Sequence, residues 1–255
     1  MLRKVLKRID RKLFRGHIAK ILLKQRRRVA KRTLKKQKFE SVEIFYNKNY
    51  TNLLADLFDK YGSDKGSNTQ PPHVFDWIPN AYADLYSFLF DSIRNQTKLI
   101  FECGIGTNNP KLTSSMGERG KPGASLRAWK EYFPNAEIYG ADIDTTIQFK
   151  EKRITTGFID QLDPTSIRKF FETHNLRGIN IAIDDGLHTY EAATTLFENV
   201  YPLLSKNGIY VIEDIHPYEM KRFIDYFNKS KIAFNYAIFT NQDGLPVGNL
   251  MWAYK

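Results

Sequence analysis

The sequence is poor in cysteine and contains no long apolar run. Its one cysteine, Cys103, excludes an intramolecular disulfide, which is typical of proteins from a reducing compartment. A membrane-spanning helix needs about 20 apolar residues. The longest apolar run near the N-terminus, IAKILL, is broken by Lys20 and lacks the apolar centre of a signal peptide. The cysteine and five histidines form no cluster, so zinc is not expected. These absences predict a cytoplasmic protein.

Acidic residues are almost missing from residues 1–38, which contain 17 lysines and arginines and one acid, Asp10. The rest of the chain contains 22 basic and 27 acidic residues, so the net charge of +11 comes from this N-terminal segment. Apolar residues recur in it at helical spacing, at Leu2, Val5, Leu6, Ile9 and Leu13. Basic amphipathic helices lie on anionic membranes, bind nucleic acid or dock on a partner. We expect residues 1–45 to form a basic amphipathic helical arm, with residues 1–38 contacting the inner membrane face; a solvated extension is the alternative.

Strand-like and helix-like segments alternate from Lys98 to the C-terminus. The expected strands cover residues 98–106, 136–144, 153–160, 179–185 and 209–214, and the expected helices cover residues 123–133, 163–175, 190–204 and 218–230. Two further strand-like segments, 234–241 and 249–255, flank a turn and predict a hairpin. This order predicts an α/β fold with a doubly wound, mostly parallel sheet and a C-terminal antiparallel hairpin. Residues 46–97 are expected to form a helical cap leading into the domain of residues 98–255.

Polar residues and glycines stand where the expected strands end. They are Glu102, Gly104 and Gly106, then Asp142 and Asp144, Asp160 and Gln161, Asp184 and Asp185, and finally Glu213 and Asp214. Ligands of an open α/β sheet bind beyond the carboxyl ends of its strands. These ends are therefore expected to form one site, although each alone could be a turn or a helix cap. Glycines let the backbone approach a ligand, an acid after the second strand can bind a ribose diol, and three carboxylates from neighbouring strands suit Mg²⁺.

Six segments together carry a family resemblance: KYGSDKGS, FECGIG, GASLRAWKEYFPNAEIYGADID, DQLD, IDDGLH and GIYVIED. They resemble the class I S-adenosylmethionine-dependent methyltransferases and, more narrowly, the metal-dependent sugar O-methyltransferases of macrolide and related glycoside pathways. The resemblance covers roughly residues 53–255. It implies a Rossmann-like, seven-stranded sheet, S-adenosylmethionine as cofactor, and Mg²⁺ or another divalent cation at the site.

The resemblance also implies roles for individual residues. Cofactor contacts fall on Tyr61, Ser63, Lys65, Glu102, Gly104, Gly106, Ser125, Asp142, Asp160 and Gln161. Metal contacts fall on Asp185, Glu213 and Asp214, and catalysis falls on His188 as general base together with Asp185. Residues 107–123 form an insert relative to the simplest family pattern, and we expect either a lid or substrate loop or a mobile loop.

The residues allow a chemical account of methyl transfer to a hydroxyl. A sugar hydroxyl is a poor nucleophile because its pKa lies far above neutrality. A divalent cation on the hydroxyl oxygen lowers that pKa, and a neutral histidine within hydrogen-bond reach can take the proton. His188 is the expected base, with a structural or substrate-orienting role as the alternative. His216, which follows the second acid pair, could cap a helix or contact substrate.

The expected function is metal-assisted, S-adenosylmethionine-dependent O-methylation of a sugar or glycan precursor, for a surface polysaccharide or a glycoside. A small phosphorylated or phosphoryl-type capsule metabolite is an alternative acceptor. A nucleotide-sugar glycosyltransferase would instead use Asp142 and Asp144 as metal-binding acids. A non-catalytic RNA-binding or scaffold module and an RNA methyltransferase are also compatible with the basic arm. Nucleic acid is disfavoured because the chain beyond residue 38 carries more acids than bases. The sequence leaves a homo-oligomer open.

Overall fold

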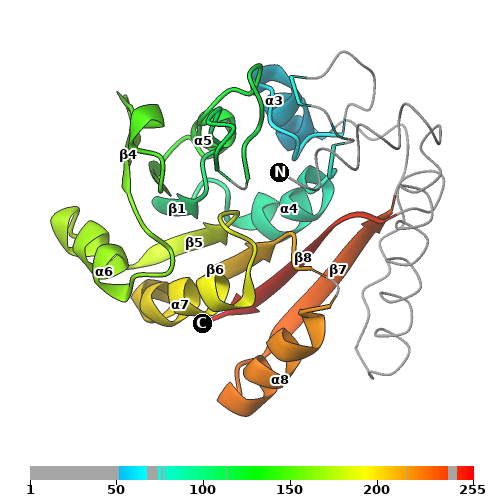
Figure 1. The fold of residues 1–255 in the computed structure, drawn as a ribbon, viewed down its shortest axis with the longest axis vertical. Coiled ribbons are helices and arrows are strands. Elements are labelled where there is room, and N and C mark those ends of the chain that lie inside the picture. The colour runs from blue at the N-terminus through cyan, green and yellow to red at the C-terminus, as the bar shows by residue number, and fades with distance from the viewer. Residues whose placement is uncertain are drawn as a thin grey trace.

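The structure, a computed structural model, describes residues 52–67, 74, 75, 77, 79–112, 114–216, 218–240 and 246–255. The arm predicted for residues 1–45, and with it the predicted membrane contact, lies outside these residues. The described chain folds around one sheet with helices packed on both of its faces (Figure 1). Within the described residues, no helix is both long enough and apolar enough to span a membrane.

Eight strands of the described residues form the sheet, in the order β3-β4-β2-β1-β5-β6-β8-β7. Their bounds are β1 Leu99–Cys103, β2 Glu137–Asp142, β3 Lys150–Glu151, β4 Ile154–Phe158, β5 Ile179–Asp184, β6 Leu204–Glu213, β7 Phe234–Thr240 and β8 Pro246–Tyr254. Strands β4, β2, β1, β5 and β6 run parallel, whereas β3, β8 and β7 pair antiparallel. The α/β fold and its C-terminal hairpin are therefore confirmed. The expected seven strands were an approximation, because the two-residue β3 is too short to recognise from its residues.

Six α-helices of the described chain cover the sheet (Figure 1). One face carries α3 Leu53–Tyr61, α4 Ala83–Phe90 and α5 Ala124–Tyr132, and the other carries α6 Pro164–Thr173, α7 Tyr190–Val200 and α8 Met220–Ser230. Each face of the sheet has its own hydrophobic core, and successive side chains of a strand pack alternately into one core and the other. Ile100 and Ile181 pack with the first group of helices, whereas Phe101 and Ala182 pack with the second. This alternation is that of parallel strands buried on both faces.

Local sequence signals set the helix boundaries in several places. Asp163 accepts a hydrogen bond from the backbone N–H of Thr165, and Pro164 occupies the first turn of α6, as predicted. One predicted helix was too long. It was expected to reach residue 204, but α7 ends at Val200, and a 3₁₀ turn, Tyr201–Leu203, leads into β6. Strand β6 therefore begins at Leu204, before the expected residue 209.

Helices α3 and α4 lie within the region predicted to form a cap. Their residues Phe58 and Tyr86 share one core with Trp129 of α5, with ring centroids 4.8 Å and 5.3 Å from the indole. Tyr82, directly before α4, and Tyr86 within it bring their hydroxyls to the end of β6, where they donate hydrogen bonds to carboxylates. The division into a cap of residues 46–97 and a domain of residues 98–255 stays a prediction.

Candidate active site

The carboxyl ends of β1, β2, β4, β5 and β6 surround a cleft of about 830 Å³. Most of the residues predicted to form the site line it: Ser63, Lys65, Gly104, Gly106, Ser125, Asp142, Asp160, Gln161, Asp185, His188 and Asp214. Tyr61, Glu102 and Glu213 are absent from its lining. Segments far apart in the sequence thus meet at one edge of the sheet, where an open α/β fold places its ligands.

The loop after β1 forms a tight boundary of the cleft. Gly104 and Gly106 have φ angles of +87° and +81°, in the region that favours glycine. A Cβ atom on Gly104 would lie 2.1 Å from the carbonyl oxygen of Asp185. One on Gly106 would lie 2.1 Å from Sδ of Met116. Glycine at these positions therefore lets the loop lie directly against both neighbours.

Asp142, at the end of β2, holds this loop in place. Its Oδ2 accepts a hydrogen bond of 3.0 Å from the backbone N–H of Ile105, and its Oδ1 accepts one of 3.0 Å from that of Asp144. Burial raises the pKa of Asp142, although these hydrogen bonds favour the carboxylate. Asp144 accepts hydrogen bonds from the hydroxyls of Thr107 and Thr146. Both acids of the DID segment thus support loops around the cleft.

Gln161 ties the loop after β4 to the loop after β5. Its Nε2 donates to Oδ1 of Asp184 at 2.5 Å, and its Oε1 accepts from the backbone N–H of Leu187 at 2.9 Å. The second oxygen of Asp184 has no hydrogen-bond partner among the described residues. Burial raises the pKa of Asp184 to about 6. Asp184 therefore acts as a buried support for the loop that presents Asp185 and His188.

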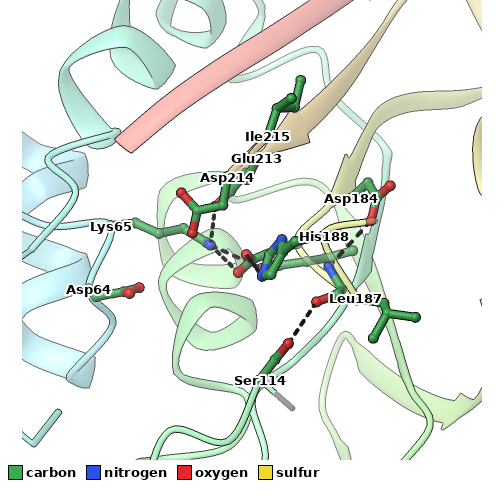
Figure 2. Close-up of polar contacts among 12 residues, drawn as sticks. Asp64, Lys65, Ser114, Asp184, Leu187, His188, Glu213, Asp214 and Ile215 are labelled. Atoms are coloured by element: carbon green, nitrogen blue, oxygen red, sulfur yellow. Dashed lines mark hydrogen bonds and ion pairs between the residues drawn. The ribbon is translucent and has the colours of Figure 1, made fainter. Parts of the chain in front are cut away.

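Asp185, His188 and Asp214 converge in the cleft, and Figure 2 shows His188 and Asp214 close to Lys65. One potential ligand atom of each lies within 4.8 Å of the others, and Nε2 of His188 is 3.8 Å from Oδ1 of Asp185. His188 and Asp214 have φ angles of +57° and +53°, which are uncommon for residues other than glycine. The hydroxyl of Tyr82 donates to Oδ1 of Asp214. Burial raises the pKa of Asp214, and the nearby His188 opposes that rise.

Lys65 places a buried ammonium beside this group (Figure 2). Its Nζ lies 2.5 Å from Oδ2 of Asp185 and 2.7 Å from Oε2 of Glu213. Burial lowers the pKa of an ammonium, but the surrounding carboxylates raise the pKa of Lys65 well above its usual value. The other oxygen of Glu213 accepts a hydrogen bond of 2.5 Å from the hydroxyl of Tyr86. The structure thus places Glu213, an expected metal ligand, against Lys65 and Tyr86.

Glu102 lies on β1, two residues before Gly104, and is fully buried. The indole Nε1 of Trp129 donates to its Oε2 at 2.7 Å, and Nζ of Lys65 lies 3.9 Å from its Oε1. Oε1 has no hydrogen-bond partner among the described residues. Burial raises the pKa of Glu102 to about 7, although Lys65 opposes that rise. Glu102 was expected to contact the cofactor, and that role stays a prediction.

The residues that line the cleft differ in part from those predicted. Tyr61 lies outside the cleft, where its hydroxyl donates to Oε2 of Glu131 at 2.7 Å. Asp64 and Trp77 also line the cleft, with Nε1 of Trp77 donating to Oδ2 of Asp64 at 2.6 Å. The segment of residues 61–65 was expected at the methionine end of the cofactor but Asp64 was given no role of its own, and Trp77 was missed. Asp64 belongs to the KYGSDKGS segment, so that motif could have indicated it. Trp77 stands in no such motif, and only the fold brings it to the cleft.

The insert of residues 107–123, described apart from residue 113, forms a wall of the cleft. Nδ2 of Asn108 donates to the carbonyl oxygens of Gly117 at 2.7 Å and Gly120 at 2.9 Å. The hydroxyl of Ser114 donates to the carbonyl oxygen of Gly186 at 3.3 Å (Figure 2). The insert therefore has internal hydrogen bonds and touches the loop after β5. Its role as a lid or substrate loop stays a prediction.

The side chains in the cleft and directly behind it fit a hard divalent cation. Five carboxylates gather around Lys65, those of Asp64, Glu102, Asp185, Glu213 and Asp214. Burial, assisted by the charges of neighbouring acids, raises the pKa of each of Asp64, Glu213 and Asp214. Mg²⁺ prefers carboxylate oxygens and needs only a few of them. A divalent cation bound there would neutralise the negative charge of these carboxylates.

No family model matches the chain. Its sequence is 32% identical over 162 residues to 8-demethyl-8-alpha-L-rhamnosyl tetracenomycin-C 2'-O-methyltransferase of Streptomyces olivaceus, covering 64% of this chain and 37% of the relative. It is 34% identical over 174 residues to L-olivosyl-oleandolide 3-O-methyltransferase of Streptomyces antibioticus, covering 68% of this chain and 40% of the relative. The chain therefore spans well under half the length of these curated relatives.

The fold is similar to that of the MycE methyltransferase from the mycinamycin biosynthetic pathway, solved in complex with Mg and SAH. The TM-score is 0.57 at 23% sequence identity, covering 80% of this chain and 55% of that one. A second MycE structure, which also contains mycinamycin VI, gives a TM-score of 0.56 at 22% identity, covering 81% of this chain and 55% of that one. At these identities the likeness concerns the fold. The sequence comparisons confirm the resemblance to sugar O-methyltransferases of macrolide and related glycoside pathways, and the structural comparison confirms the Rossmann-like methyltransferase fold.

Proposed function

We propose that the chain is an S-adenosylmethionine-dependent O-methyltransferase that methylates a hydroxyl of a sugar or glycan precursor with the help of Mg²⁺ or another divalent cation. One observation carries this proposal: the cleft that holds the glycine loop also holds Asp185, His188 and Asp214. A cofactor at the loop and an acceptor at the acids would therefore share one cavity. The sequence relatives are named as O-methyltransferases, which supports the same reaction.

The cofactor is proposed to bind along the loop after β1. Gly104 and Gly106 let its main chain approach a ligand. The carboxylate of Asp142 lines the cleft at the end of β2, in a position suited to a ribose diol. Ile143 and Leu162 line the same cavity with about half of their surface exposed, 50% and 52%, and offer apolar surface to the adenine ring. The remaining contacts are assigned to Ser63, Lys65, Ser125, Asp160 and Gln161, all in the lining.

The divalent cation is proposed to bind Asp185 and Asp214, with Glu213 as the third predicted ligand after release from Lys65. When bound there, a divalent cation would lower the pKa of an acceptor hydroxyl. His188 then accepts the hydroxyl proton on Nε2, which Asp185 flanks at 3.8 Å. The acceptor oxygen forms a bond to the methyl carbon as the carbon–sulfur bond of S-adenosylmethionine breaks. The products are a methyl ether and S-adenosylhomocysteine.

The acceptor is proposed to bind beside Trp77 and His216, which line the cleft together with the acids. The indole of Trp77 is 40% exposed and is held by its hydrogen bond to Asp64. Aromatic faces of this kind suit the apolar C–H face of a pyranose, while the carboxylates of the cleft suit its hydroxyls. A sugar therefore matches these surroundings of the acids.

The basic arm is proposed to hold the enzyme near membrane-bound glycan assembly on the cytoplasmic side. Residues 1–38 carry 17 basic residues and one acid, a composition that favours anionic lipid. Sedimentation with anionic liposomes tests this part separately. Full-length protein is expected to sediment with the vesicles and a protein lacking residues 1–38 to stay in solution. Equal sedimentation of the two proteins would remove membrane contact from the proposal.

Methyl transfer itself is tested with labelled S-adenosylmethionine. Purified protein is incubated with the labelled cofactor and with nucleotide-sugars or cell-envelope extracts, and the products are analysed by mass spectrometry. The proposal predicts a gain of one labelled methyl group on a saccharide. Binding of UDP-sugars without any binding of S-adenosylmethionine would favour a glycosyltransferase instead.

A further inference from the structure

Lys65 reaches the acids of the cleft from a distant part of the chain. It follows α3, and its backbone is fixed to the start of α4, because its carbonyl oxygen accepts a hydrogen bond of 2.9 Å from the N–H of Ala83. The neighbouring Asp64 carbonyl accepts one of 2.7 Å from the N–H of Asn80. The side chain is 2% exposed. The fold thus directs this ammonium into the acid cluster.

The ammonium of Lys65 links carboxylates from three neighbouring strands. Asp185 follows β5, Glu213 ends β6, and Glu102 lies on β1, with nitrogen-to-oxygen distances of 2.5, 2.7 and 3.9 Å. A buried carboxylate without a cation or hydrogen bonds is costly. Lys65 therefore supplies the positive charge that lets Asp185 and Glu213 lie close together without a metal ion.

Two of these oxygens belong to residues that the proposed function assigns to the metal. Oδ2 of Asp185 and Oε2 of Glu213 both face Nζ of Lys65. A divalent cation that binds the same oxygens must replace the ammonium there or share them with it, and two cations so close repel each other. Lys65 and the metal are therefore in competition for one set of carboxylates.

We propose that Lys65 is an internal cation that preforms the carboxylate cluster in the metal-free protein and is displaced from Asp185 and Glu213 when a divalent cation binds. This inference rests on the metal-assisted reaction proposed above. Lys65 is then a positioning residue with a regulatory effect. Its charge keeps the mutually repelling carboxylates together, and it also weakens the affinity of these carboxylates for metal. The metal-free protein is then stable, and the cation enters a site that already exists.

The substitution Lys65→Met tests this, because methionine keeps much of the length of the side chain and removes its charge. Mn²⁺, which takes oxygen ligands and is visible by electron paramagnetic resonance, is titrated into full-length wild type and variant. We expect Lys65→Met to bind Mn²⁺ at least about tenfold more tightly and to gain more thermal stability from it than wild type. Lys65→Arg retains the charge and is expected to stay near the wild-type affinity or below it.

The matched control is Lys60→Met, which removes a lysine paired with Glu131 at 2.7 Å on the surface. It should leave Mn²⁺ affinity unchanged. Equal or weaker Mn²⁺ binding by folded Lys65→Met would overturn the inference. If Lys65→Met folds only when Mn²⁺ is supplied, the metal has replaced the lost charge and the inference is supported. If Lys65→Met fails to fold even with Mn²⁺, the metal cannot take the place of the ammonium at Asp185 and Glu213, and the inference is overturned. Wild type that transfers methyl groups but binds no Mn²⁺ would overturn this inference and leave the methyltransferase proposal standing.

Discussion

The backbone of Gly104 packs against that of Asp185, so closely that a Cβ on Gly104 would lie 2.1 Å from the Asp185 carbonyl oxygen. The loop proposed to hold the cofactor and the loop proposed to hold the metal are thus in direct contact. Substituting Gly104→Ala must move one of them. We expect S-adenosylhomocysteine binding to weaken at least about tenfold, equivalent to about 1.4 kcal/mol, in isothermal titration calorimetry.

Gly117→Ala provides the control for that substitution. Gly117 also has a positive φ, +82°, but a Cβ there would meet no atom of the described residues within 4 Å. Both variants carry the backbone strain of a non-glycine residue, about 1–2 kcal/mol, and only Gly104→Ala carries the clash. Equal cofactor affinity in the two variants would show that the contact between the two loops is unimportant.

Glu102 predicts a dependence of stability on pH. Burial raises its pKa from 4.5 to about 7, so the folded protein holds this proton more tightly than the unfolded chain. The stability it contributes is complete below pH 4.5 and is lost as the pH rises through about 7. Glu102→Gln removes that loss, so the variant should gain on the order of 3 kcal/mol relative to wild type between these pH values.

Urea unfolding of the metal-free proteins between pH 4.5 and 8 measures that difference. Glu137→Gln, at an exposed position at the start of β2, controls for the loss of one negative charge. A difference between wild type and Glu102→Gln that stays constant with pH would mean that Glu102 remains ionised in the folded state.

His188 is predicted to act in the chemical step. Its removal in His188→Ala should lower turnover by about 10²–10⁴-fold, the usual contribution of a general base, while S-adenosylhomocysteine still binds. His174→Ala serves as the control, because His174 makes an edge-to-face contact with Phe170 at the end of α6 and does not line the cleft. Near-normal turnover of His188→Ala would take the base role from this histidine. If His188→Ala loses both turnover and Mn²⁺ binding, His188 is a metal ligand instead. Its position beside Asp185 and Asp214 also allows that role.

Trp77 is predicted to contribute to acceptor binding. Trp77→Ala should raise the KM for the sugar acceptor about 3–10-fold, which corresponds to the 0.5–1.5 kcal/mol of an aromatic contact. Cofactor affinity should stay unchanged. The control is Phe88→Ala, which removes an aromatic ring that is 69% exposed on α4 and absent from the cleft lining. An unchanged KM in Trp77→Ala would move the acceptor away from this wall.

The strand-end residues could be predicted because their signals are local. Apolar runs that end in acids or glycines mark buried parallel strands, and the topology then brings those ends together. Asp142, Gln161 and Asp185 were found in this way, and all line the cleft. The position of α6 was equally clear, since Asp163 and Pro164 mark its start.

The contacts around Glu213 could not be predicted, because they depend on residues far away in the sequence. Lys65 is 148 residues and Tyr86 is 127 residues from Glu213. Glu213 is the last residue of β6, and Asp214 follows it with a positive φ, outside the strand. Both carboxylates accept hydrogen bonds from tyrosines at α4, Tyr86 for Glu213 and Tyr82 for Asp214, but only Asp214 lines the cleft. The two letters ED alone cannot show this.

The central claim is metal-assisted methyl transfer from S-adenosylmethionine, and its most direct measurement uses labelled cofactor, a saccharide acceptor and control of the metal. Purified protein is treated with excess EDTA, assayed for labelled product, and assayed again after Mg²⁺ is added in excess. The carboxylate cluster predicts that EDTA abolishes transfer and that Mg²⁺ restores it. Full transfer of the labelled methyl group in excess EDTA would contradict the account.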